Sequence, residues 1–117
     1  MYWPYLDIDI FEFENRIHIA ENFLMKNGAT YVNDHTELKH CILQDGSCYT
    51  YEDTQKVFKY MDEFIRIDKV FFPNIPWIVL EFSKDIDGPY EDEDPFPYNL
   101  EIKEFENEIR YSMGIMD

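Results

Sequence analysis

The chain has 117 residues, of which 45% are hydrophobic and 18% are aromatic, and its formal net charge is −15. Such a chain is long enough for one domain with a real core, residues 1–117, and its content of Phe and Tyr excludes a disordered acidic polypeptide. Lys and Arg are too few to match a phosphate backbone, so we expect no direct contact with nucleic acid or with an anionic membrane.

The first predicted element is a helix over residues 10–27. Apolar residues recur there at helical spacing, namely Ile10, Phe13, Ile17, Ala20 and Leu24. Asp9 and Glu12 have the spacing of a capping box, and Gly28 suits the residue after the helix. Residues 6–13 also alternate in part like a strand, so a strand remains the alternative for the first turns.

A short strand over residues 29–32, ended by Asn33 and Asp34, is predicted next. Residues 38–44 and 47–51 then flank Asp45-Gly46, a dipeptide typical of a tight hairpin turn. A two-residue turn would pair Leu43 with Cys48 and Ile42 with Tyr49. One face of this hairpin would then carry Cys41, Leu43, Cys48 and Thr50.

The second half of the chain predicts two further helices around a buried strand. Thr50 and Asp53 suggest a capping box for a helix over residues 51–67, whose apolar stripe is Val57, Tyr60, Met61, Phe64 and Ile67. Residues 69–72 suit a short strand, and the apolar run 77–82 suits a central one. A last helix over residues 100–113 begins after Asn99 and ends at Gly114.

These elements predict an α+β fold. We expect a two-layer single domain in which a small, mostly antiparallel sheet with a central β-hairpin packs against about three helices.

No motif in the sequence identifies a metal site or a catalytic centre. The residues His35, His40, Cys41 and Cys48 lack the usual spacing of zinc ligands, and adjacent strand residues point to opposite faces. A mid-strand thiol in a strongly negative field is a poor nucleophile. We therefore expect no metal, no cofactor and no enzymatic activity, and we interpret both cysteines as reduced thiols of a cytoplasmic protein.

The least ordinary stretch is the loop from Asp85 to Pro97. It carries six carboxylates, and no Lys or Arg lies between Lys84 and Lys103. Asp85 and Asp87 resemble the start of a calcium loop, but Gly88 stands at position 4 instead of 6, and Phe96 occupies position 12. Prolines at positions 89, 95 and 97 restrict the loop, which lowers the entropy lost when it binds a partner.

The sequence therefore favours an acidic inhibitor of a basic protein. Carboxylates steer association with a basic surface, and neighbouring aromatic side chains provide anchors. We expect the partner to be a toxin or nuclease domain, as for bacterial immunity proteins, antitoxins and phage antagonists. The residues expected to bind it are Asp85, Asp87, Tyr90, Glu91, Asp92, Glu93, Asp94 and Phe96, extended by Glu101, Glu104 and Glu108.

Two alternatives remain open. One is a small enzyme or ligand-binding domain with an aromatic pocket built from Trp3, Tyr49, Tyr51 and Trp77. The other is an interaction module without an inhibitory role. The sequence does not indicate an oligomeric state.

Overall fold

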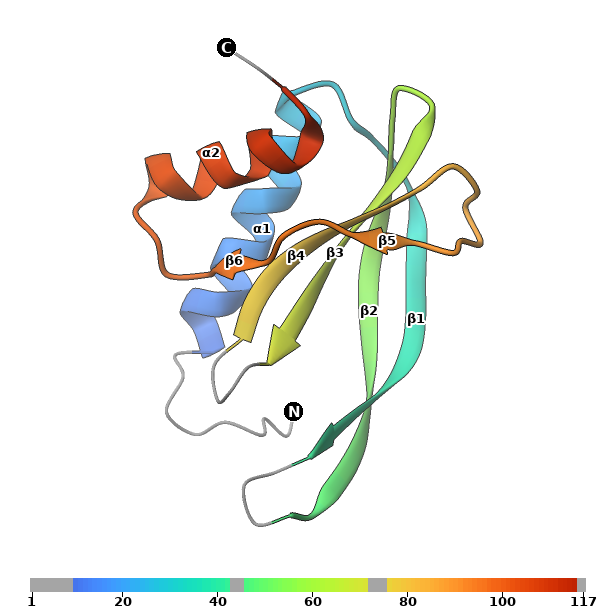
Figure 1. The fold of residues 1–117 in the computed structure, drawn as a ribbon, viewed down its shortest axis with the longest axis vertical. Helices are drawn as coiled ribbons and strands as arrows, with labels where there is room; N and C mark the ends of the chain where they lie inside the picture. The colour runs from blue at the N-terminus through green and yellow to red at the C-terminus, as the bar shows by residue number, and fades with distance from the viewer. Residues whose placement is uncertain (1–9, 43–45, 72–75, 116–117) are drawn as a thin grey trace.

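A computed structural model describes residues 10–42, 46–71 and 76–115. These residues form two helices and six strands (Figure 1). In chain order they are α1 (Ile10–Lys26), β1 (Thr30–Ile42), β2 (Cys48–Tyr60), β3 (Glu63–Phe71), β4 (Pro76–Ser83), β5 (Glu91–Asp92), β6 (Phe96–Pro97) and α2 (Ile102–Met113).

All strand pairs in the sheet are antiparallel. The strands follow the order β1-β2-β3-β4-β5, and β6 also pairs with β4. The strand β1 pairs with β2 along almost its whole length, whereas β2 pairs with β3 only between 57–60 and 63–66. The rest of the hairpin, 34–42 and 48–56, therefore forms a two-stranded arm that diverges from β3 (Figure 1).

The hydrophobic core lies between the two helices and one face of the sheet, called here the helix face. From the helices, Phe13, Ala20, Leu24, Phe105 and Ile109 are buried. The sheet contributes Phe58, Ile65, Ile67, Ile78 and Leu80. Burying one such large apolar side chain stabilises the fold by about 1.5–3 kcal/mol, so this layer holds the helices on the sheet.

Both terminal helices agree with the sequence pattern. The helix α1 ends where Gly28 adopts a φ of 104°, and the Ala29 amide donates a 3.0 Å hydrogen bond to the Leu24 carbonyl. The helix α2 likewise ends at Gly114, with a φ of 77°. Its first helical residue is Ile102, and Glu101 occupies the N-cap position expected for Asn99. Asp9, the expected cap of α1, lies outside the described residues.

The expectation of about three helices is wrong. Residues 51–67, predicted as a helix, form most of β2, a turn at Met61 and Asp62, and the first half of β3. Phe58 and Ile65 lie outside the predicted helical stripe, yet both are fully buried, whereas Met61 in the stripe is 79% exposed. Strand geometry explains this pattern because Val57 and Phe58 are buried on opposite faces of β2.

The predicted hairpin exists, but its register and length differ from the prediction. Ile42 pairs with Cys48 and Cys41 with Tyr49, so the backbone positions of Cys41 and Cys48 belong to opposite faces. Leu43 lies outside the described residues. The strand does not end at Asn33 and Asp34 either, because a β-bulge between Tyr31 and Asn33 lets β1 continue.

The strand β4 has the buried central position that its apolar run predicts. Ile78 and Leu80 contact the helix-face core, and Val79 is buried on the opposite face. Neither helix of the described part of the chain is long and apolar enough to cross a membrane.

Candidate functional site

The acidic loop is held along the outer edge of β4 by its two short strands. Glu91 pairs with Phe82 and Asp92 with Glu81 through β5, and the Glu93 amide donates a 2.9 Å hydrogen bond to the Leu80 carbonyl. Because side chains of a strand alternate between faces, this pairing sends Glu91 to the helix face and Asp92 to the opposite one. The structure thus divides the predicted site between two surfaces.

On the helix face, the loop lines two adjoining open depressions that we call the acidic groove. A depression of about 300 Å³ lies between Glu91, Glu93 and the end of α2, where Tyr111 and Gly114 contribute. A second, of about 520 Å³, extends along Asp85 and the turn that follows β4. Glu63 and Phe82 line both of them. The groove therefore combines a half-buried aromatic ring with carboxylates from β3 and from the loop.

The carboxylates of the groove have no cation of their own among the described residues. None of the ion pairs formed there involves Glu63, Asp85, Glu91 or Glu93. Lys84 is the one basic residue on the described lining, and it forms a 3.3 Å pair with Asp62. The groove is consequently a region of negative potential.

A row of exposed residues on α2 leads towards the groove. Glu101 at the N-cap and Glu104, Glu108 and Tyr111 of α2 recur at helical spacing beside the buried stripe of Phe105 and Ile109. Tyr111 ends this row, is 73% exposed and lines the groove. The three glutamates of the predicted extension are therefore exposed, and of this row it is Tyr111 that lines the groove.

The remaining predicted site residues lie elsewhere. Asp87 and Asp94 are exposed. Phe96 is only 2% exposed, and its ring packs edge-on against Phe105 with the centroids 5.5 Å apart. Contrary to the expectation of a surface anchor, Phe96 belongs to the core. Tyr90 and Asp92 face the other side of the sheet.

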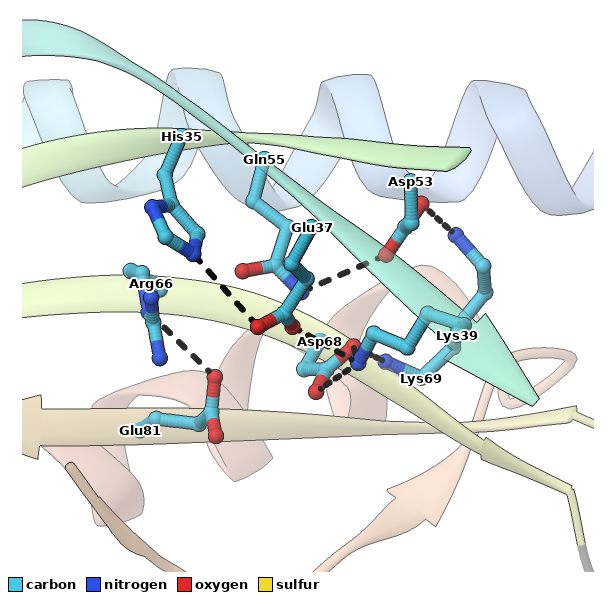
Figure 2. Close-up of polar contacts among 9 residues, drawn as sticks. All are labelled: His35, Glu37, Lys39, Asp53, Gln55, Arg66, Asp68, Lys69 and Glu81. Carbon is cyan, nitrogen blue, oxygen red and sulfur yellow. Dashed lines mark hydrogen bonds and ion pairs between the residues drawn. The ribbon is translucent and has the colours of Figure 1, made fainter. Parts of the chain in front are cut away.

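That other side carries a network of charged groups, which we call the polar face (Figure 2). Lys39 of β1 binds both carboxylate oxygens of Asp68 at 2.7 and 2.6 Å and also pairs with Glu37 at 3.1 Å. Lys69 forms a short hydrogen bond to Asp53. These pairs join the arm to β3 across the gap where β2 and β3 are not paired.

A second group on the polar face surrounds Glu81. Its Oε1 lies 3.5 Å from Arg66 Nε, and the Arg66 guanidinium lies 3.8 Å from the centre of the Tyr90 ring. Burial, the charge of Asp68 and a hydrogen bond with Asp92 raise the pKa of Glu81 to about 7. Glu81 is therefore largely protonated below neutral pH.

Sequence reasoning missed Glu63 and the residues of the polar face. Glu63 lies in the stretch that was expected to form a helix, and the β2–β3 hairpin brings it to the same groove as Glu91. Arg66 and Glu81 are partners because the β3–β4 register pairs them directly. The apolar run of β4 contains one charged residue, Glu81, and that interruption was the available signal of a buried carboxyl group.

The residues of the alternative aromatic pocket are described only in part. Tyr51 and Trp77 are half-buried, whereas Trp3 and the Tyr49 side chain lie outside the described part of the chain. Within the described ranges, no three or more His, Cys, Asp or Glu residues are arranged to hold a metal ion. Cys48 is a free, exposed cysteine.

Comparison of the chain with protein-family models, with curated proteins and with solved structures finds no match.

Proposed function

We propose that this protein is a stoichiometric inhibitor of a basic protein, of the immunity or antitoxin kind, and that it binds a Lys- or Arg-bearing segment in the acidic groove. The observation that carries the proposal is the groove itself. Glu63, Glu91 and Glu93 surround Phe82 without an internal counter-ion among the described residues.

The groove suits a long basic side chain for three physical reasons. The aliphatic stem of Lys or Arg packs on an aromatic ring while its charged end reaches a carboxylate. The last turn of α2 forms one wall, and the carbonyl groups of a helix C-terminus favour a cation. The row of Glu104 and Glu108 adds charge that steers a basic partner towards the groove.

The distribution of the basic residues supports the same reading. Several of the ten Lys and Arg residues form partly buried ion pairs within the molecule, namely Lys39, Lys69, Arg16 and Arg66. Residues 81–117 carry 12 of the 25 acidic side chains and 3 of the 10 basic ones. The field around the groove is therefore negative, which raises the association rate of a basic partner.

The proposal is tested by capturing the partner with matched charge variants. The immobilised protein is incubated with lysate of the source cells in parallel with Glu91→Lys/Glu93→Lys and with Glu14→Lys/Glu52→Lys. The last variant changes the net charge equally at exposed positions outside the groove. We expect a basic protein that is captured by the wild type and by the control, and that is lost with the groove variant.

The captured protein is then purified and its activity titrated with the inhibitor. Loss of activity at one equivalent, with an association rate that falls steeply as salt increases, is the expected result. Equal loss of capture in both charge variants would reduce the interaction to non-specific attraction. Capture without any effect on the partner's activity would refute an inhibitory role.

A further inference from the structure

The inference concerns the two carboxyl groups that face each other between β4 and β5. The register places Glu81 directly opposite Asp92, and the Asp92 carboxyl group is close enough to raise the pKa of Glu81. Glu81 is only 9% exposed. Like charges directly opposite in an antiparallel pair are destabilising, so this contact needs a proton between the two groups.

Three other groups face this pair in the described structure. Arg66 lies beside Glu81, Asp68 adds a second negative charge from β3, and the Tyr90 ring covers the Arg66 guanidinium. With a proton on the pair, Arg66 balances its single negative charge. Without the proton, two carboxylates face each other beside one guanidinium, and Asp68 increases the repulsion.

The pair lies in the short strand that carries two of the groove carboxylates. The strand β5 consists of Glu91 and Asp92 alone, and the next described backbone contact is the hydrogen bond from the Glu93 amide to the Leu80 carbonyl. Both neighbours of Asp92 in the chain are carboxylates of the acidic groove. Movement of Asp92 away from Glu81 would therefore shift Glu91 and Glu93 as well.

We propose that the Glu81–Asp92 pair is a proton-dependent clasp, which holds β5 on β4 while it carries a proton and loosens β5 when the proton is lost. The Glu81 pKa of about 7 places this change near neutral pH. The effect on binding rests on the proposed function. Release of β5 displaces Glu91 and Glu93, so a basic partner bound in the groove dissociates faster above pH 7.

Hydrogen exchange of the Glu93 amide, followed by NMR on the full chain from pH 6 to pH 8, tests the clasp without any partner. After correction for the intrinsic exchange rate, we expect protection in the wild type to fall about tenfold, as linkage predicts if opening restores an ordinary Glu pKa. In Glu81→Gln the side chain stays neutral, and we expect protection to be independent of pH.

Asp94→Asn is the matched control, because it removes one carboxylate from the same exposed loop without touching the pair. It should retain the tenfold change. Asp92→Asn, a substitution at an exposed position, replaces Glu81→Gln if that variant does not fold. It should reduce the change, because burial and Asp68 still raise the pKa of Glu81 but the residue opposite no longer carries a charge. Protection that stays constant in the wild type, or that changes with pH as much in Asp92→Asn as in the wild type, would overturn the clasp.

The clasp and the proposed function fail in different experiments. A pH-dependent exchange of Glu93 establishes the clasp even if no basic partner is captured. If a partner is captured through Glu91 and Glu93 but the exchange does not respond to pH, the groove remains and the clasp is refuted.

Discussion

Lys39 of β1 and Asp68 of β3 form an ion pair with both carboxylate oxygens, although β2 lies between their strands in the sheet. Alternate strands of a sheet lie about 10 Å apart, so the contact uses the length of the Lys39 side chain to reach across the polar face. Burial lowers the pKa of Lys39, but the hydrogen bonds to Asp68 and Glu37 outweigh it and raise that pKa. The Lys39–Asp68 pair is therefore charged, and it holds the arm to β3.

Removing this pair should destabilise the protein measurably. We expect Lys39→Met to lower the free energy of unfolding by roughly 2 kcal/mol, because it leaves the mostly buried Asp68 carboxylate without its cation. Urea denaturation monitored by tryptophan fluorescence gives the value. Lys84→Met is the control, since the Lys84–Asp62 pair is exposed, and we expect no measurable change. Equal effects of both substitutions would contradict a fastening role for Lys39.

Stability should fall as the pH rises towards neutrality because of Glu81. Its pKa is about 7 in the folded state and near 4.5 when unfolded, so the folded state binds more protons between these values. The loss begins near pH 4.5, is complete just above pH 7, and amounts to about 1–3 kcal/mol after allowance for solvent screening.

The measurement is a series of urea unfolding curves from pH 4.5 to pH 8 for the wild type and for Glu81→Gln. The substitution should remove most of the slope over this range and raise the stability at pH 8. A wild-type curve that rises with pH, or one unaffected by Glu81→Gln, would contradict a protonated Glu81.

Two neighbouring apolar residues distinguish the observed hairpin from the predicted helix. We expect Phe58→Ala to cost about 3–5 kcal/mol, because its ring is fully buried under the helices. Met61→Ala should change the stability by less than about 0.5 kcal/mol, since Met61 is 79% exposed in the turn. On a helix with the predicted stripe the order would be reversed. Thermal and chemical unfolding of both variants would reveal that reversal.

The turn between β2 and β3 should accept glycine. Met61 has a φ of 55°, a left-handed conformation that suits the first central residue of a two-residue hairpin turn when that residue is glycine. We expect Met61→Gly to stabilise the protein by about 0.5 kcal/mol, because the relief of strain exceeds the entropy that glycine adds to the unfolded chain. A lower midpoint of unfolding for this variant would contradict the strained turn.

The sequence was sufficient to predict the two helices, whose residues follow a local pattern. The stripe of Phe13, Ala20 and Leu24 is set by one helical period, and Gly28 and Gly114 mark the helix ends because few other residues accept a positive φ. The stretch 51–67 was not predictable in this way. Its helical pattern of Val57, Tyr60 and Phe64 competes with pairings to the neighbouring strands β1 and β4, which the pattern within the stretch does not show.

The sequence likewise predicted only part of the candidate site. The charge density of the loop is visible in the sequence, but which carboxylates share a surface depends on the β4–β5 register. That register separates Glu91 from Asp92 and brings Glu63 to the groove. Phe96 could not be distinguished from an exposed aromatic residue, since nothing in its neighbourhood shows that it packs on Phe105.

The order of the strands also has a consequence for how the chain folds. From β1 to β4 every strand pairs with the one that follows it in the sequence, so the sheet can form through successive hairpins without closing a long loop. Proteins dominated by such local pairings fold faster than those that join distant segments. We expect the sheet to form early and α1 and α2, which contact each other from opposite ends of the chain, to dock last.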